Sequence, residues 1–301
     1  MVFLKTRTAG GIEYYYAVES ESGSQRDVYY FGNKKPTNYE WQAVLNALEK
    51  KDEFSPKKTE WTNEQEQRVK ELNERMQKEF NEMNENEKSN FYDKFYNDYI
   101  YNTNSIEGST LTKDETYFVT HEKQGISGKS LKEVYMARNL MQAINFLDSY
   151  SGKLNIELIK KLHIVVQENI QPGNELGLYK KRQNYIIGTD FLPTPPNLVE
   201  KRMNGLMRWY GLNRKKYSAF ELDAIFHIKF VSIHPFVDGN GRTARLLHNF
   251  ILKRNGVAPI IYRMETKQTY YSMLRAAQLH GEHKGFIDYA LGEFVATYEG
   301  Y

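Results

Sequence analysis

One short polar loop between two apolar stretches constrains the fold of this chain more than any other feature. Residues 234–245 read His-Pro-Phe-Val-Asp-Gly-Asn-Gly-Arg-Thr-Ala-Arg. The apolar residues before the loop predict a buried helix that ends near His234, because Pro235 disfavours the helical conformation at the preceding residue. The apolar residues of 244–252 predict a second buried helix. The sequence therefore predicts two consecutive core helices with the polar loop between them.

The loop has the composition of a phosphate cradle. Gly239 and Gly241 flank Asn240, so several backbone N–H groups can point into one concavity, where the start of a helix adds a positive dipole end. Arg242 and Arg245 fall in the first turn of the second helix, where the dipole disfavours cations. A bound polyanion explains both arginines, because guanidinium groups match phosphate oxygens.

Two further side chains of the loop suit phosphate chemistry. Asp238 is a carboxylate beside the cradle, and Mg²⁺ is commonly held by one carboxylate together with substrate phosphates. His234 lies at the loop entrance and can accept a proton near neutral pH. The alternative is a polar turn with a buried, hydrogen-bonded histidine. The presence of all these groups within one turn favours a functional site.

The loop resembles the core motif of Fic-domain proteins, His-Pro-Phe-x-Asp/Glu-Gly-Asn-Gly-Arg-x-x-Arg, and matches every specified position. The resemblance implies transfer of AMP from ATP to a tyrosine, serine or threonine hydroxyl of a target protein and of the chain itself. The roles it implies are general base for His234, loop anchor for Phe236, Mg²⁺ ligand for Asp238, anion cradle for Gly239, Asn240 and Gly241, and phosphate contacts for Arg242 and Arg245.

A second motif lies upstream, at the end of a predicted helix. Residues 103–108 read Thr-Asn-Ser-Ile-Glu-Gly, which places Glu107 near the negative dipole end, where a carboxylate is unfavourable. Such a local violation is typical of functional residues. The segment resembles the inhibitory motif Ser/Thr-x-x-x-Glu-Gly/Asn of Fic proteins that carry an N-terminal inhibitory helix. The resemblance implies that Glu107 pairs with Arg245 and blocks the productive phosphate pose of ATP. The alternative is an exposed acid whose ion pair contributes only ~0–1 kcal/mol.

Residues 172–198 form the main irregular stretch of the chain. Residues 185–188 and 191–192 suggest a short hairpin, closed by prolines. The resemblance makes this hairpin a flap that holds the target by strand-like pairing. The flap residues would be Ile187, Gly188, Thr189, Asp190, Phe191 and Leu192. An ordinary surface hairpin is the alternative.

The remaining segments predict the domain organisation. Residues 1–50 contain three β-branched and aromatic runs separated by glycine and serine turns, which predict a small β-rich module followed by a short helix. Residues 51–89 predict a linker and an amphipathic helix. Residues 90–301 are predicted to be a Fic domain, with its inhibitory helix near 99–108. The predicted class is mainly α: a Fic-type helical bundle with a short β-hairpin flap and a small β-containing N-terminal module, which we interpret as a packing appendage rather than a docking surface.

Composition excludes several classes of protein. The 301 residues carry a formal net charge of +3, which does not favour nucleic acid as a partner. The chain has no cysteine, which excludes disulfides and thiolate metal sites. It shows neither an apolar run long enough to span a membrane nor a signal peptide, so a cytoplasmic protein is expected.

Three functional alternatives stay open. The first is removal of AMP from modified proteins, with Glu107 orienting a water molecule. The second is another donor, such as UTP or CDP-choline, or phosphotransfer from ATP; Arg242 argues against phosphotransfer, because that branch of the family carries lysine there. The third is a non-catalytic nucleotide-sensing interaction module. The oligomeric state is also open, with a homodimer among the alternatives.

Overall fold

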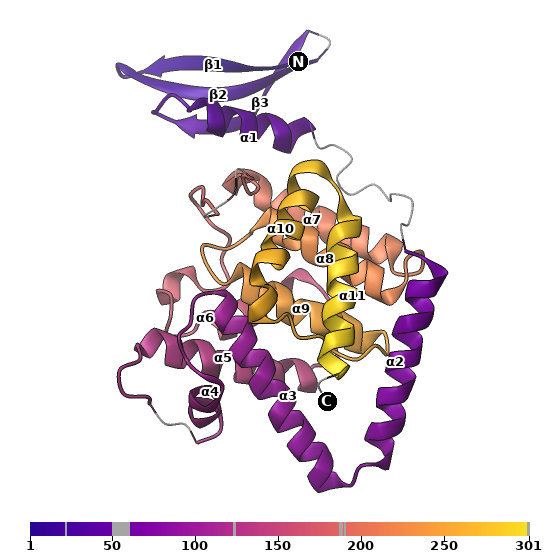
Figure 1. Ribbon diagram of the computed structural model, residues 1–301. Coiled ribbons are helices and arrows are strands. Elements are labelled where there is room, and N and C mark those ends of the chain that lie inside the picture. The colour runs from indigo at the N-terminus through magenta and orange to yellow at the C-terminus, as the bar shows by residue number, and fades with distance from the viewer. Residues whose placement is uncertain (22, 50–60, 123–124, 187–188, 190, 300–301) are drawn as a thin grey trace.

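The computed structural model describes residues 1–21, 23–49, 61–122, 125–186, 189 and 191–299, and the chain is mainly helical, as predicted (Figure 1). The sheet and its helix comprise β1 (Val2–Ala9), β2 (Ile12–Glu21), β3 (Ser24–Gly32) and α1 (Asn38–Glu49). The helical body comprises α2 (Asn63–Glu82), α3 (Glu85–Ile106), α4 (Lys113–Thr120), α5 (Leu131–Ser149), α6 (Ile156–Gln167), α7 (Pro196–Asn213), α8 (Ala219–Ile233), α9 (Asn240–Arg254), α10 (Lys267–His280) and α11 (His283–Glu299). Short 3₁₀ turns lie at Gly173–Glu175 and Met264–Thr266.

The N-terminal module is an antiparallel meander in the order β1-β2-β3, which confirms the three predicted strands. Helix α1 lies beside this sheet, outside the helical body (Figure 1). The ring of Phe31 on β3 lies 6.0 Å from that of Trp41 on α1. These aromatic contacts, together with buried Ala17 and Val44, give the module a small core of its own.

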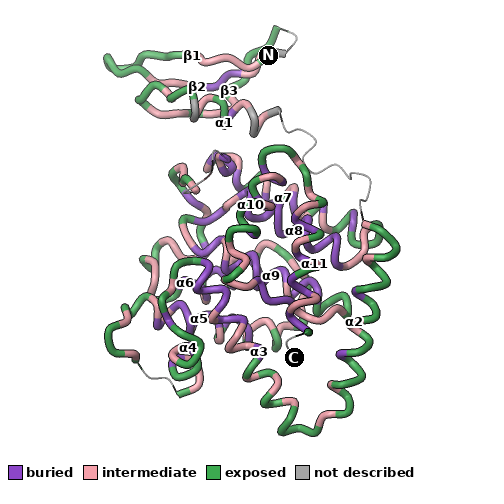
Figure 2. The backbone as a smooth tube through the Cα atoms, viewed as in Figure 1, coloured by how far each residue is buried: buried purple, intermediate pink, exposed green. Residues whose placement is uncertain are grey.

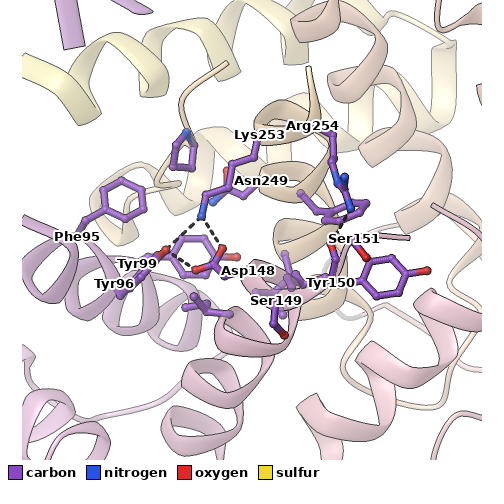
Figure 3. A pocket seen from close by; sticks show the side chains of 15 residues that line it. Phe95, Tyr96, Tyr99, Asp148, Ser149, Tyr150, Ser151, Asn249, Lys253 and Arg254 are labelled. Carbon is purple, nitrogen blue, oxygen red and sulfur yellow. Dashed lines mark hydrogen bonds and ion pairs between the residues drawn. The ribbon is translucent and has the colours of Figure 1, made fainter. Parts of the chain in front are cut away.

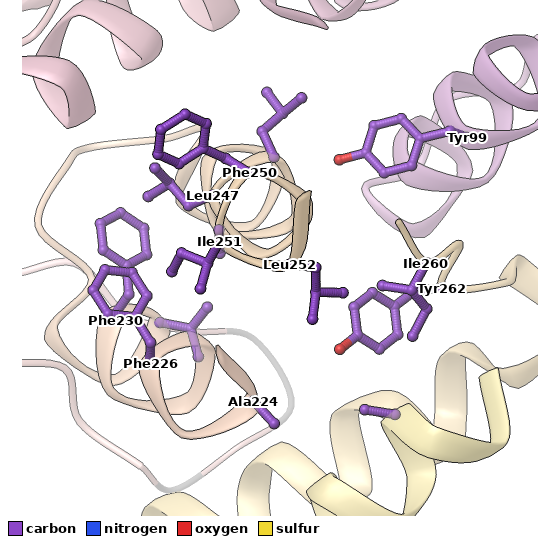
Figure 4. Close-up of a cluster of buried hydrophobic side chains, with 14 of the residues drawn as sticks. Tyr99, Ala224, Phe226, Phe230, Leu247, Phe250, Ile251, Leu252, Ile260 and Tyr262 are labelled. Carbon is purple, nitrogen blue, oxygen red and sulfur yellow. The ribbon is translucent and has the colours of Figure 1, made fainter. Parts of the chain in front are cut away.

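Helix α8 is the centre of the helical body. Every residue of α8 from Phe220 to Ile233 is buried, and α7, α9, α10 and α11 all contact it. Figure 2 shows the buried residues along the backbone, and Figure 4 shows side chains of α8 and α9 that meet in this core. A helix with neighbours on all sides is apolar around its whole circumference. This explains why the apolar residues before the loop lack a single stripe.

Helix α3 is longer than the sequence predicted and carries the second motif at its end. A capping box formed by Asn84 and Glu87 starts the helix at Glu85, so the boundary predicted between residues 89 and 90 falls inside α3. Helix α2 packs against α11 and so belongs to the helical body. Capping boxes at Thr112 and Ser130 start α4 and α5. None of the described helices is both long enough and apolar enough to cross a membrane.

Candidate functional site

The motif loop begins where α8 ends, as predicted. His234 caps α8 in the left-handed conformation, with φ 51° and ψ 60°. A non-glycine residue in this region is strained and is commonly found at functional sites. Gly239, with φ 76°, then caps the start of α9. The loop is therefore a tight connection with an unusual backbone at both of its ends.

The core of the protein braces this loop. Phe236 is fully buried, and its ring stacks on that of His163 from α6 at 3.8 Å. The Asn240 side chain accepts from Phe236 N and donates to Phe236 O, both at 2.9 Å. His163 Nδ1 accepts from Gly177 N at 3.0 Å, so Nε2 carries the proton and donates to Asp238 O at 3.0 Å. Burial lowers the pKa of His163 to about 4, which keeps this brace neutral.

Gln167, also on α6, supports the start of α9. With its amide oriented by its hydrogen-bond partners, its oxygen accepts from Gly239 N at 2.7 Å and from Arg242 Nη2 at 3.1 Å. A Cβ atom at Gly239 would lie 2.2 Å from the Gln167 side chain. Only glycine fits this position, because it needs both the positive φ and the close approach of Gln167.

The start of α9 concentrates hydrogen-bond donors that lack acceptors. Arg242 and Arg245 are only 2% and 1% exposed. In the described part of the chain, Nε and Nη1 of both guanidinium groups have no hydrogen-bond partner. The first turn of a helix also leaves its backbone N–H groups open. Because buried donors without acceptors are costly, this arrangement indicates a site that an anion completes.

Glu107 lies directly over this anion site. Its Oε1 accepts from Arg245 Nη2 at 2.6 Å, and a Cβ atom at Gly241 would lie only 2.2 Å from the same oxygen. Arg245 Nη2 also donates to Thr103 O at 3.0 Å. Burial opposes the charge of Arg245, but the Glu107 carboxylate holds the pKa of Arg245 above its ordinary value. Gly108 follows the C-cap of α3 with φ 96°, a conformation that favours glycine.

His234 has the tautomer of a general base. Its Nδ1 lies 3.4 Å from Val231 O, and because a carbonyl only accepts, Nδ1 carries the proton. This leaves the Nε2 lone pair available. Burial and, next in size, the positive charge of Lys180 lower the pKa of His234 to about 4. The imidazole is therefore neutral at pH 7 and able to accept a proton.

Asp238 is the acidic side chain of the loop. Its Oδ1 accepts from Gly239 N at 2.6 Å, and its Oδ2 lies 3.4 Å from Arg242 Nη2. Although burial opposes its charge, Arg242 and the Gly239 N–H hold the pKa of Asp238 below its ordinary value. The described residues contain no cluster of three metal-ligating side chains. A single half-exposed carboxylate beside an anion site nevertheless fits Mg²⁺, whose remaining ligands are phosphates and water.

The flap prediction falls partly outside the described residues. Ile187, Gly188 and Asp190 are not described, whereas Thr189 and Leu192 are partly buried and Phe191 is buried.

The described residues between α6 and α7 form no β-strand, in contrast to the predicted hairpin. Their polar groups bond elsewhere. Gln183 Nε2 donates to Pro193 O at 3.2 Å, and Asn184 Nδ2 donates to Phe236 O at 3.0 Å. The segment is therefore tied to itself and to the motif loop rather than paired as a ribbon.

A cavity of about 350 Å³ lies between α3, α5 and the C-terminal half of α9 (Figure 3). Its polar groups bond to one another: Asp148 accepts from Tyr96 at 2.7 Å and from Lys253 at 2.8 Å. This internal pairing contrasts with the unpartnered donors at the motif loop. The motif loop is therefore the stronger candidate for anion binding.

Comparison with known proteins shows similarity to one family over the part of the chain that contains the motif loop. The model of the Fic/DOC family matches residues 153–252, which include the loop and the supporting helix α6. A protein named protein adenylyltransferase Fic, from Nematostella vectensis, is 35% identical over 211 residues, which are 68% of this chain and 48% of that protein. Protein adenylyltransferase fic-1 from Caenorhabditis elegans is 34% identical over 67% of this chain and 40% of that protein. The chain thus spans about half or less of the length of these relatives.

Two solved structures have a similar fold. A Fic domain containing signaling protein from Bacteroides thetaiotaomicron aligns with a TM-score of 0.69 and 25% identity, over 77% of this chain and 95% of that one. A fragment of Fic-1 from C. elegans aligns with a TM-score of 0.69 and 29% identity, over 79% of this chain and 71% of that one.

Proposed function

The chain belongs to the Fic/DOC family, and from this premise we propose that it transfers AMP from ATP to a hydroxyl side chain of a target protein and of itself. Relatives at 35% and 34% identity carry the name protein adenylyltransferase, which supports this activity. The acceptor is a tyrosine, serine or threonine hydroxyl.

The buried, unpartnered guanidinium nitrogens at the start of α9 carry the proposal. Arg242 and Arg245 together present two Nε and two Nη1 donors without acceptors among the described residues. The adjoining helix N-terminus adds backbone N–H groups and a positive dipole end. A triphosphate supplies enough oxygen atoms for all of these donors, with its terminal phosphate at the position that the Glu107 carboxylate takes in this structure.

The reaction is an in-line attack of the acceptor hydroxyl on the α-phosphorus of ATP, with pyrophosphate as the leaving group. His234 Nε2 accepts the hydroxyl proton, because Nδ1 is held by Val231 O. Asp238 would hold Mg²⁺, which when bound neutralises charge on the α and β phosphates. The rest of the catalysis is positioning and electrostatic stabilisation by the braced loop, as in phosphoryl transfer generally.

Glu107 inhibits the protein in this proposal. Its carboxylate pairs with Arg245 and sits over Gly241, where the terminal phosphate of ATP would lie. ATP must therefore displace a carboxylate from a buried arginine before it can bind productively. We expect low basal activity, because shifting a population from mostly closed to mostly open takes about 5.5 kcal/mol of differential binding.

Removal of AMP is a second candidate, favoured by the position of the same carboxylate. Although burial and the charge of Lys180 lower the pKa of His234, the charge of Glu107 acts on it in the opposite direction. Glu107 can orient a water molecule towards the α-phosphorus, and a protonated His234 can donate to the leaving hydroxyl. In this reaction Glu107 is required, whereas in AMP transfer it inhibits.

Labelled ATP distinguishes these reactions. The Glu107→Gly variant is incubated with Mg²⁺ and ATP labelled at either the α or the γ phosphate. AMP transfer predicts that protein acquires the α label and not the γ label. The γ label on protein would indicate phosphotransfer. Bound nucleotide with no labelled protein would favour a non-catalytic module.

Mass spectrometry of a lysate treated with the same variant and each of ATP, UTP and CDP-choline would identify the donor, target and acceptor. The Glu107→Gly, His234→Ala double variant is the matched control, because it keeps the opened anion site and lacks the base. For the reverse reaction, wild-type protein is incubated with the labelled product without ATP. Loss of label would support removal, and stable label would count against it.

A further inference from the structure

Lys180 is a buried lysine next to the motif loop that the reaction above does not use. It is 3% exposed, and its Nζ donates to Asn184 Oδ1 at 2.6 Å. Burial lowers the pKa of Lys180 to about 7. A methionine or leucine would fill the same space without the desolvation of an amine, so packing alone does not explain the lysine.

Lys180 and Asn184 hold two consecutive carbonyls of the motif loop. The backbone N–H of Lys180 donates to Pro235 O at 2.9 Å. The Asn184 side chain donates through Nδ2 to Phe236 O at 3.0 Å, and through Oδ1 it accepts from the Lys180 amine. Residues 180–184 thus hydrogen-bond to the backbone directly after His234, and His234 itself has a positive φ.

The amine also acts on the imidazole through its charge. Three charged groups face His234: Lys180 opposes its protonation, whereas Glu107 and Asp238 favour it. Burial is the largest cause that lowers the pKa of His234, and the positive charge of Lys180 comes next. Below about pH 7 the Lys180 amine is charged, which includes the range in which His234 would gain a proton.

We propose that Lys180 is a positioning residue for the reaction: together with Asn184 it fixes the backbone after His234, and its charge keeps the imidazole ready to accept a proton. This inference rests on the proposed function for its biological meaning. The acceptor hydroxyl loses its proton to His234 only if Nε2 is unprotonated when the hydroxyl arrives. The positive charge of Lys180 favours the unprotonated imidazole and so opposes the effect of the Glu107 and Asp238 carboxylates.

The direct test is an NMR titration of the His234 imidazole, which needs no activity. The resonance is assigned by its absence from His234→Ala, and the midpoint is measured in wild type, Lys180→Met, Lys180→Arg and Lys181→Met. Lys180→Met removes a positive charge that opposes protonation of His234, so it should raise the midpoint. Lys180→Arg keeps the charge and should keep the midpoint near its wild-type value.

Lys181→Met is the matched control, because Lys181 is the exposed neighbour and receives the same substitution. It should leave the midpoint unchanged. A midpoint in Lys180→Met equal to that of wild type would overturn the proposal.

The pH dependence of AMP transfer gives a second readout, measured in the Glu107→Gly background. Adding Lys180→Met should move the acidic limb of kcat to higher pH by the same amount as the NMR midpoint, with the Kd for ATP unchanged. A uniform fall of kcat at every pH, with no shift of the limb, would indicate a structural role and contradict the proposal.

The two readouts separate the two claims. A shifted midpoint in a protein that transfers no AMP would refute the proposed function and leave the effect of Lys180 on His234 intact. If the enzyme transfers AMP but Lys180→Met leaves the His234 midpoint unchanged, the proposed function stands and the effect of Lys180 on His234 is refuted.

Discussion

Replacing Glu107 by glycine should both destabilise the unliganded protein and release its activity. The substitution leaves Arg245, which is 1% exposed, without the carboxylate that lies 2.6 Å away. Removing one partner of a buried ion pair costs about 3–5 kcal/mol, because the other charge stays buried. The Glu107 side chain is 29% exposed, so we expect ~3 kcal/mol, near the lower end of that range.

The free energy lost with the Glu107–Arg245 ion pair is regained when ATP binds to the variant. The terminal phosphate of ATP can replace the missing carboxylate at Arg245 and recover the lost interaction. At 1.4 kcal/mol for each factor of ten, ~3 kcal/mol lowers the Kd for ATP by about 100-fold. Self-labelling from α-labelled ATP should rise with occupancy of the site.

Three measurements check this prediction. Thermal unfolding without nucleotide should show a Tm several degrees lower than that of wild type, and ATP with Mg²⁺ should raise the Tm of the variant more than that of wild type. Calorimetric titration gives the Kd, and the α label gives the activity. Glu107→Gln is the control that removes the charge and retains the bulk of the side chain over Gly241; it should release less activity than glycine.

The reasoning would be refuted if Glu107→Gly bound ATP with the wild-type Kd and labelled itself no faster than wild type. A variant that gains affinity without any labelling would keep the ion-pair argument and refute the inhibitory role.

Two further predictions follow from the site, and a third follows from the start of α5. His234→Ala should bind ATP with nearly the wild-type Kd and lose AMP transfer; retained transfer would mean that another base acts. Asp238→Asn should move the Mg²⁺ dependence of transfer to higher concentrations, and an unchanged Mg²⁺ titration would exclude Asp238 as a ligand. Hydrogen bonds from Thr110 and Ser130 lower the pKa of Glu133 to about 2 from 4.5. These bonds contribute stability that is present above pH 4.5 and lost as pH falls towards about 2, so in urea unfolding Glu133→Gln should flatten the pH dependence over this interval. An equally steep dependence in the variant would contradict this.

The sequence alone predicted the parts of the site that lie within one continuous segment. The turn from α8 to α9 follows from Pro235 and the two glycines, which act through local backbone preferences. Glu107 at the end of α3 stood out because a carboxylate there opposes the helix dipole. The pairing of Glu107 with Arg245 was predicted from two further observations. Arg245 is a cation at the start of α9, where the helix dipole disfavours positive charge, and the family resemblance implies the pair.

The supporting residues could not be predicted in the same way. His163 reaches Asp238 across 75 positions of sequence, and Lys180 and Asn184 reach the loop from the irregular segment before α7. Their roles arise from tertiary contacts, which leave no periodic pattern. The one local signal was polarity within an apolar helix, as for His163 and Gln167 on α6, and that signal is shared by core residues with no role in a site. Asn139 on α5 is such a residue: it is a buried amide that donates to Val166 O and Glu168 O.

The flap lies only partly within the described residues, so the predicted hairpin stays a prediction. The apolar residues of 185–192 have strand-like composition, but the described ones form no strand. The side chains of Gln183 and Asn184, which precede them, donate to Pro193 O and to Phe236 O of the motif loop. Composition indicates that a segment can form a strand, but a strand also needs a partner strand for its backbone hydrogen bonds, and composition does not show whether one is present.

The most direct test of the whole account is a crystal structure of the Glu107→Gly variant with ATP and Mg²⁺. The account predicts the terminal phosphate against Arg245 and the N-terminus of α9, the metal on Asp238, and the α-phosphorus facing His234 Nε2. A nucleotide bound elsewhere, such as in the cavity between α3, α5 and α9, with the motif loop left empty, would contradict it.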